Sequence, residues 1–174
     1  LWVWGLNNYG RLGLNEATPV AHSSPVQVPG TTWSQFSFGD GTMALKTDGT
    51  LWGWGSNYYG SLGLNESGNG SYYSSPVQIP GAYKKFSVGD YWSVIQKTDD
   101  TLWAVGSNDF GQFANSSEDA GTRRYSSPVQ IPGTNWTDFR AGATHLMLIN
   151  TDGELWVQGQ NARGQLGQND AVYK

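Results

Sequence analysis

The sequence predicts an all-β fold built from the four-stranded blades of a β-propeller. Three motifs recur in the same order along the 174 residues, at a spacing close to the length of one blade. Each period divides into four short segments of strand-like composition. The chain also holds 24 Gly, 9 Trp and 9 Tyr, while only 14% of its residues are charged. This composition is typical of tight turns and pleated sheets, and good helix formers are scarce.

The first motif joins Trp-rich residues to a turn containing Gly and Asn. Its copies begin at Leu1, Leu51, Leu102 and Leu155, so the steps between them are 50, 51 and 53 residues. The copies at 1–15 and 51–65 share 11 of 15 residues. Such close copies at one period are the signature of a repeat architecture.

Two further motifs keep the same period. Ser-Ser-Pro-Val-Gln-Val/Ile-Pro-Gly occupies 23–30, 74–81 and 126–133. The third motif runs from an aromatic residue through Gly to an Asp-containing turn, and its copies begin at Phe36, Phe86 and Phe139. Three motifs in a fixed order at one spacing are not expected by chance.

Four strands are expected in each period. In the best-defined copy, strand one is Phe36–Gly39 and strand two is Met43–Lys46, followed by an Asp-Gly turn of the kind that closes hairpins. Strand three is Leu51–Gly55. Strand four is Pro76–Ile79, and its flanking prolines suit an outer edge because Pro cannot donate to a strand ladder.

One such sheet cannot bury both of its faces, so neighbouring sheets must stack. We expect the aromatic residues of strand three to pack between blades. Trp2, Trp52, Trp103 and Trp156 recur at one position of the repeat and are therefore expected in the core.

The repeats resemble the regulator of chromosome condensation repeat family. That family's motif is Leu/Val-Tyr/Trp-x-Trp-Gly-x-Asn-x-x-Gly-Gln-Leu-Gly, preceded by Ala-Gly-x-x-His and an Asp-Gly turn. The fourth copy matches it at 141–145, 152–153 and 161–167. Two copies depart from the family's His, which is replaced by Trp92 and by Gly41 or Thr42, depending on where a one-residue gap is placed.

The resemblance covers the whole chain and implies a seven-bladed propeller. Seven repeats need about 350 residues at this period, so we expect about 3.5 blades. They divide into a partial blade at 1–30, blades at 31–81 and 82–133, and a partial blade at 134–174, all in one repeat domain. The chain is then a bacterial or phage-type member or a fragment of a longer propeller, or several copies assemble.

Charge and composition argue against several functional classes. The net charge is −4, and the ten Lys and Arg residues form only two adjacent pairs, Lys84–Lys85 and Arg123–Arg124. A nucleic-acid partner is therefore not expected, because it requires a basic face. The absence of Cys excludes disulfides and Cys-based metal sites. No apolar run approaches the ~20 residues of a membrane span.

No set of residues predicts catalysis, a metal site or a cofactor. His22 and His145 are the only histidines, and His145 falls at the family's structural His position. Asp48, Asp99 and Asp152 recur at the hairpin turns and are expected to serve the turns. Asp40 and Asp90 follow the repeat Gly, where they are expected to line one mouth of the propeller. The sequence therefore favours a protein that is not an enzyme.

One segment of the repeat varies in length and sequence. Between the Leu-Gly turn and the Pro of strand four, the step grows from 13 to 14 to 15 residues along the chain. Because repeat proteins often bind through such variable loops, we take them as candidate partner-binding loops. They carry Tyr72, Tyr73, Arg123, Arg124 and Tyr125, and Tyr and Arg are enriched at interface hot spots.

Three functions remain open. The first is a non-enzymatic scaffold for protein–protein interaction or assembly, in a setting such as a virion or cell surface rather than the cytoplasm. Its partner would be another protein, further copies of the chain or the rest of a longer chain. The second, implied by the resemblance, is guanine-nucleotide exchange on a small GTPase. The third is a carbohydrate-binding propeller, for which Trp92 is the one tryptophan outside the repeat pattern.

Overall fold

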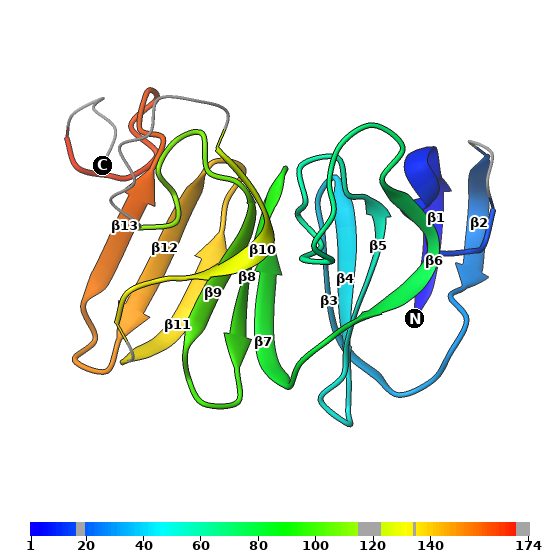
Figure 1. Cartoon of the computed structure of the whole chain (residues 1–174), viewed down its shortest axis with the longest axis horizontal. Coiled ribbons are helices and arrows are strands. Elements are labelled where there is room, and N and C mark those ends of the chain that lie inside the picture. Colours follow the sequence, from blue (N-terminus) through cyan, green and yellow to red (C-terminus); the bar gives the residue numbers. More distant parts are fainter. Residues whose placement is uncertain (17–19, 115–122, 134, 170–174) are drawn as a thin grey trace.

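The computed structural model describes residues 1–16, 20–114, 123–133 and 135–169. These residues form antiparallel sheets that stand side by side (Figure 1). The first sheet pairs β1 (Trp2–Leu6) with β2 (Ala21–Gln27), and a short 3-10 helix, η1 (Asn8–Gly10), follows β1. No helix among the described residues is long and apolar enough to span a membrane.

Two complete four-stranded sheets follow, and in both the strands lie in chain order. The first contains β3 (Trp33–Phe38), β4 (Gly41–Lys46), β5 (Leu51–Ser56) and β6 (Tyr72–Ile79). The second contains β7 (Tyr83–Val88), β8 (Trp92–Lys97), β9 (Leu102–Ser107) and β10 (Arg124–Gln130). The last sheet has β11 (Trp136–Ala141), β12 (His145–Asn150) and β13 (Leu155–Gly159). The predicted all-β fold of four-stranded blades in a partial propeller is confirmed.

Strand four was predicted too short. The strand β6 begins at Tyr72 and not at Pro76, because Tyr72 and Tyr73 pair with Ser56 and Gly55 of β5. The register shifts between Gly53 and Gly55, and this irregularity accommodates the proline inside the strand. The strands β6 and β10 lie at the edges of their sheets, as the prolines predicted.

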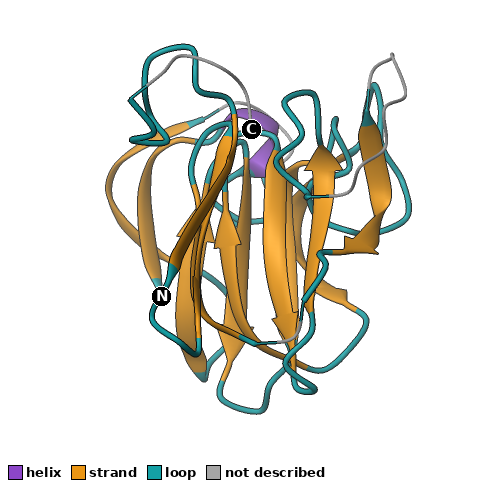
Figure 2. Ribbon diagram, turned by 90° about the vertical axis from the view of Figure 1, so that its left-hand side faces the viewer, coloured by secondary structure: helices purple, strands orange, loops and turns teal. Residues whose placement is uncertain are grey.

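The core lies between neighbouring sheets. One cluster of buried residues joins Met43 and Leu51 of the first complete sheet to Phe86 and Ile95 of the second. A second cluster joins the second complete sheet to β11 and β12, and Phe139 is among its buried residues. The two buried clusters thus lie between adjacent sheets, as the stacking argument predicted. Figure 2 shows the sheets from the side.

The recurring tryptophans do not all lie in this core. Trp54 is fully buried, and its indole N–H donates to the carbonyl of Arg11 in the preceding repeat, at 3.0 Å. By contrast, Trp52 and Trp103 are only half-buried, so their predicted place in the core was wrong. Both lie next to the hairpin end of the sheet, where a Lys ammonium covers each ring at 4.2 and 3.8 Å.

Their shared position in the repeat does, however, give matching environments. The indole N–H of Trp52 donates to Thr50, and that of Trp103 donates to Thr101, in each case two residues earlier. In the two incomplete sheets the equivalent residues are exposed, Trp2 at 59% and Trp156 at 54%.

A buried asparagine closes the turn after strand three in every repeat. Its side-chain oxygen accepts a hydrogen bond at 2.9–3.0 Å from the backbone N–H five residues later. The four asparagines, all at most 1% exposed, are Asn7, Asn57, Asn108 and Asn161. The Gly-x-Asn-x-x-Gly motif is therefore a turn clamp, because a buried amide must be satisfied where it lies.

The Ser-Ser-Pro motif ties each of the two complete sheets to the sheet before it. The backbone N–H of Asn15 donates to the carbonyl of Ser74, and the hydroxyl of Ser75 donates to the Asn15 side chain at 2.9 Å. Asn65 makes the same two contacts with Ser126 and Ser127 in the next sheet. The repetition explains why this motif recurs.

The structure also settles the gap at the family's His position. Gly41, Trp92 and His145 pair with equivalent glycines of strand three, so Gly41 and not Thr42 occupies that position. One residue, Asp40, separates Gly39 from Gly41. In the next two repeats, two residues separate the corresponding glycine from Trp92 and from His145. The first complete sheet is one residue shorter in this loop.

Candidate protein-interaction surface

The loops that join strands one to two and three to four gather at one end of the sheets, at the top of Figures 1 and 2. The hairpin turns between strands two and three lie at the opposite end. Because the sheets stand side by side, loops from successive repeats become neighbours at the loop end. For example, the backbone N–H of Asp40 donates to the carbonyl of Asp90 at 3.1 Å.

A hollow of about 510 Å³ opens at this end and is lined by five tyrosines. We call it the tyrosine hollow. Its lining residues are Tyr9, Asp40, Ser56, Tyr58, Tyr59, Gly68, Asn69, Gly70, Ser71, Tyr72 and Tyr91. They come from the first incomplete sheet and from both complete sheets, so the hollow exists only where neighbouring sheets stack.

The tyrosine rings stand in two groups. Tyr9 and Tyr72 pack edge to face with centroids 6.3 Å apart. Tyr59 contacts Tyr58 at 4.9 Å and Tyr91 at 4.5 Å. Tyr9 is 60% exposed, and Tyr58, Tyr72 and Tyr91 are between 36% and 44% exposed. Rings held by one another keep their exposed faces in fixed positions, which lowers the entropy cost of binding.

Arg124 borders this group of rings. Its guanidinium carbon lies 4.3 Å from the centroid of Tyr59 and 4.8 Å from that of Tyr58. Arg124 is on β10 and the two tyrosines follow β5, so the cation–π contact links two sheets.

The charges in and beside the hollow are two carboxylates, Asp40 and Asp90, and two guanidinium groups, those of Arg11 and Arg124. Asp40 lines the hollow, and its nearest carboxylate oxygen lies 3.6 Å from a guanidinium nitrogen of Arg11, too far for a direct hydrogen bond. Asp90, next to Tyr91, is exposed. The two aspartates predicted at one mouth of the propeller thus lie at the loop end.

The structure separates the five residues that the sequence singled out. Four of them lie in strands and not in loops, because β6 and β10 begin earlier than predicted. Tyr72 lines the hollow and Arg124 borders it. Tyr73 packs against the buried core, and the ring of Tyr125 contacts Phe113 at 5.5 Å. Arg123 precedes β10, and its backbone N–H donates to Asp109.

Sequence reasoning missed four tyrosines of the hollow, Tyr9, Tyr58, Tyr59 and Tyr91. Three of them lie in the Gly-x-Asn-x-x-Gly motif, at the two unspecified positions between the Asn and the second Gly. Tyr91 occupies the equally variable position before strand two. The two motif positions differ between repeats while the Asn and the second Gly stay the same. Such variation could have identified them from the sequence, because it marks side chains that the turn itself does not need.

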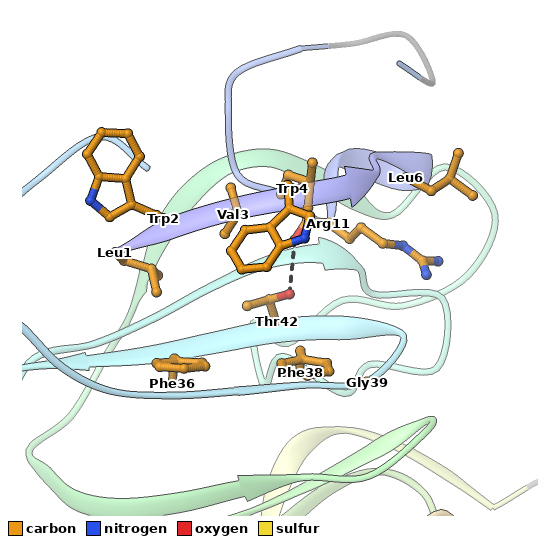
Figure 3. Close-up of a pocket in the computed structure, with 11 residues that line it drawn as sticks. Leu1, Trp2, Val3, Trp4, Leu6, Arg11, Phe36, Phe38, Gly39 and Thr42 are labelled. Carbon is orange, nitrogen blue, oxygen red and sulfur yellow. Dashed lines mark hydrogen bonds between the residues drawn. The ribbon is translucent and has the colours of Figure 1, made fainter. Parts of the chain in front are cut away.

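A second hollow, of about 400 Å³, lies between β1 and β3 at the open end of the stack. Figure 3 shows Trp4, Phe36 and Phe38 around it, together with the hydrogen bond from Thr42 to the carbonyl of Arg11. These three aromatic residues are 60–72% exposed, whereas Trp54 and Phe86, the equivalents of Trp4 and Phe36, are 0% and 6% exposed. In a complete blade, strands one and two cover this face.

The described residues contain no group of three or more His, Asp or Glu side chains that could hold a metal ion. His22 contacts Glu16 at 2.8 Å. Asp48 accepts hydrogen bonds from the backbone N–H and hydroxyl of Thr50, which lower the pKa of the Asp48 carboxyl. Asp99 does the same with Thr101. These two aspartates serve the hairpin turns, as predicted.

Trp92 does not offer a surface for sugar stacking. It is 1% exposed, and its indole N–H lies within hydrogen-bonding distance of the carbonyls of Gly142 and Ala143 in the next sheet. The residue that favoured a carbohydrate-binding function from sequence is therefore part of the packing between sheets.

Comparison with protein families gives a match over more than half of the chain. The model described as "Regulator of chromosome condensation (RCC1) repeat" matches residues 1–45 and 48–95. A second model of the same description matches residues 34–61.

Solved structures of similar fold include human WBSCR16, with 22% identity and a TM-score of 0.84 over 99% of this chain. Yeast RCC1 (Prp20) bound to Kap60 has 17% identity and a TM-score of 0.82 over 99% of this chain. Prp20p from Saccharomyces cerevisiae, in a structure whose description mentions binding to Gsp1p and histones, has 18% identity and a TM-score of 0.77 over 97%. The chain covers 46%, 42% and 43% of those proteins, so the likeness concerns the fold and spans less than half of their length.

Proposed function

Because the chain belongs to the family of regulator of chromosome condensation (RCC1) repeats, we propose that it is a non-enzymatic scaffold that binds a partner protein through the tyrosine hollow. One observation carries the proposal: stacked sheets bring five tyrosines and Arg124 to one end of the molecule. Interfaces are enriched in Tyr and Arg because these side chains bury large areas at a low entropy cost.

The constant residues of the repeat have structural roles, which leaves partner recognition to the variable residues. The buried asparagines clamp the turns and the Ser-Ser-Pro contacts join neighbouring sheets. These residues leave little for recognition. The contact of Tyr9 with Tyr72 recurs as that of Tyr59 with Arg124, but the residue on strand four differs between the two repeats. A rigid frame that carries variable aromatic side chains on its loops is a common design for binding proteins.

A photo-crosslinking experiment tests this function. Tyr72 is replaced with p-benzoylphenylalanine, and Gln78, an exposed residue at the other end of the same strand, is replaced in a control. Crosslinking of a discrete partner protein is expected from position 72 and not from position 78. Equal capture from both positions, or capture from position 78 alone, would contradict the assignment of the surface.

Guanine-nucleotide exchange is the second candidate function, and the similarity in fold to yeast RCC1 (Prp20) favours it. Exchange needs no catalytic residues, only a surface that distorts a nucleotide site. The release of a labelled guanine nucleotide from a small GTPase separates the two candidates. Acceleration by the chain would support exchange, and an unchanged rate would remove it.

The proposed setting is an assembly on a virion or cell surface. The acidic net charge of −4 and the close similarity of the repeats fit a structural component. Partner proteins, further copies of the chain and the rest of a longer propeller are all compatible with a scaffold. Negative-stain imaging of intact particles with an antibody against the chain would test this setting.

A further inference from the structure

We propose that the tyrosine hollow binds an extended, arginine-bearing segment of the partner protein. This inference rests on the proposed function, and it adds the chemistry of the bound segment. Three features of the hollow support it: what its rings already bind, which charges are open to a partner, and how much space it encloses.

The rings already hold a guanidinium. Arg124 lies over the faces of both Tyr58 and Tyr59, so these rings accept a planar cation in the native fold. Tyr9, Tyr72 and Tyr91 present 43–60% of their surface to solvent nearby. Arg stacks on aromatic faces better than Lys because its guanidinium is planar and more weakly hydrated.

An exposed carboxylate beside the rings, that of Asp90, favours a cationic segment. Asp40 lines the hollow, and Arg11, its partner, approaches only to 3.6 Å. Asp90 is exposed beside Tyr91. Arg124 stacks on the rings that it borders and Arg11 lies beside Asp40, so Asp90 is the carboxylate best placed to receive a partner. An arginine there can stack on a ring and pair with a carboxylate at once.

The space fits a short stretch of chain. A hollow of about 510 Å³ falls within the range of typical ligand sites and exceeds what one side chain fills. The loop from Gly68 to Ser71 forms part of the lining, and Asn69 and Gly70 in it are exposed. Their polar groups can hydrogen-bond the backbone of an extended segment, whereas the rings contact its side chains.

The test uses the full chain and a fluorescein-labelled nonapeptide that carries three arginines separated by proline and serine. Fluorescence anisotropy should show saturable binding that weakens as salt is added. The same peptide with lysine should bind roughly threefold or more weakly, and the peptide with glutamate should not bind.

Variants of the hollow locate the site. Tyr72→Ala and Tyr91→Ala should each weaken binding roughly three- to tenfold, since each removes one aromatic contact. Asp90→Asn should also weaken binding and flatten its salt dependence. Gln78→Ala, at the far end of β6, should leave binding within about twofold. Unchanged thermal unfolding of each variant shows that the fold is retained.

Several outcomes would overturn the inference. These are equal binding of the arginine and glutamate peptides, no binding of either, or binding that none of the three hollow variants changes. Recognition of glycans on an array without binding of the arginine peptide would also overturn it. If position 72 crosslinks a partner whose contact segment lacks arginine, the proposed function survives and this inference fails.

Discussion

Replacing Trp54 with alanine is expected to lower the free energy of unfolding by about 3–5 kcal/mol. The indole is fully buried, packs against Gly13 of the preceding repeat and donates to the carbonyl of Arg11. Alanine would leave a cavity between the first two sheets and would remove one of the two hydrogen bonds that the Arg11 carbonyl accepts, the other coming from Thr42. Urea denaturation followed by circular dichroism measures the loss.

Trp52 provides the matched control. It lies two residues earlier on the same strand, is only half-buried, and donates to Thr50 within its own sheet. Trp52→Ala should therefore cost clearly less than Trp54→Ala. If the two substitutions were equally destabilising, the distinction between Trp54 in the core and Trp52 at the margin would be wrong.

Replacing Asn57 with alanine is expected to cost about 1–3 kcal/mol, because the buried backbone N–H of Leu62 loses its hydrogen bond. The Asn57 side chain accepts from the backbone N–H of Leu62 and donates to the carbonyl of Glu66. No water reaches a side chain that is fully buried. The turn that carries Tyr58 and Tyr59 should loosen with it.

The control for Asn57 lies in the same loop. Asn69 is exposed, so Asn69→Ala should change the stability by no more than about 0.5 kcal/mol. Chemical denaturation of both variants gives the comparison. Similar losses at the two positions would contradict the role of Asn57 as the clamp of this turn.

The period of the sequence predicted the fold because every constant residue has a repeated physical task. The glycines form turns, the asparagines clamp them and the Ser-Ser pairs join sheets. Strand four was predicted too short because Pro76 reads as the end of a strand. The register irregularity opposite Gly53 and Gly55 lets the strand continue to Tyr72, and such an irregularity has no clear sequence signal.

The tyrosine hollow could be predicted only in part. Tyr72 and Arg124 were found because their segment varies between repeats. Tyr9 and Tyr91 come from other repeats, 63 and 19 residues away from Tyr72 in the sequence. Their convergence depends on the angle and spacing at which sheets stack, which the sequence of one repeat does not encode locally.

The burial of the tryptophans shows a similar limit. Trp52 and Trp54 have the same residue type and lie on the same strand, so the sequence does not distinguish them. What separates them is the distance from the hairpin turn, where the stack ends and Lys46 covers the outer ring.

Stacking of neighbouring sheets is the claim on which both the fold and the hollow depend, and two glycines test it most directly. Gly60 and Gly111 occupy the same position of the repeat and have similar positive φ values, +79° and +73°. A Cβ at Gly60 would lie 2.7 Å from the Cα of Ser126 in the next sheet, whereas a Cβ at Gly111 would have no neighbour within 4 Å. The backbone strain of alanine is thus similar at both positions.

The measurement is the difference in unfolding free energy between Gly60→Ala and Gly111→Ala, obtained by chemical denaturation. Stacking predicts that Gly60→Ala is more destabilising by about 1–3 kcal/mol, because the added methyl group forces the two sheets apart. Equal destabilisation by the two substitutions would mean that the sheets do not contact one another at Gly60, and would contradict the stacked arrangement.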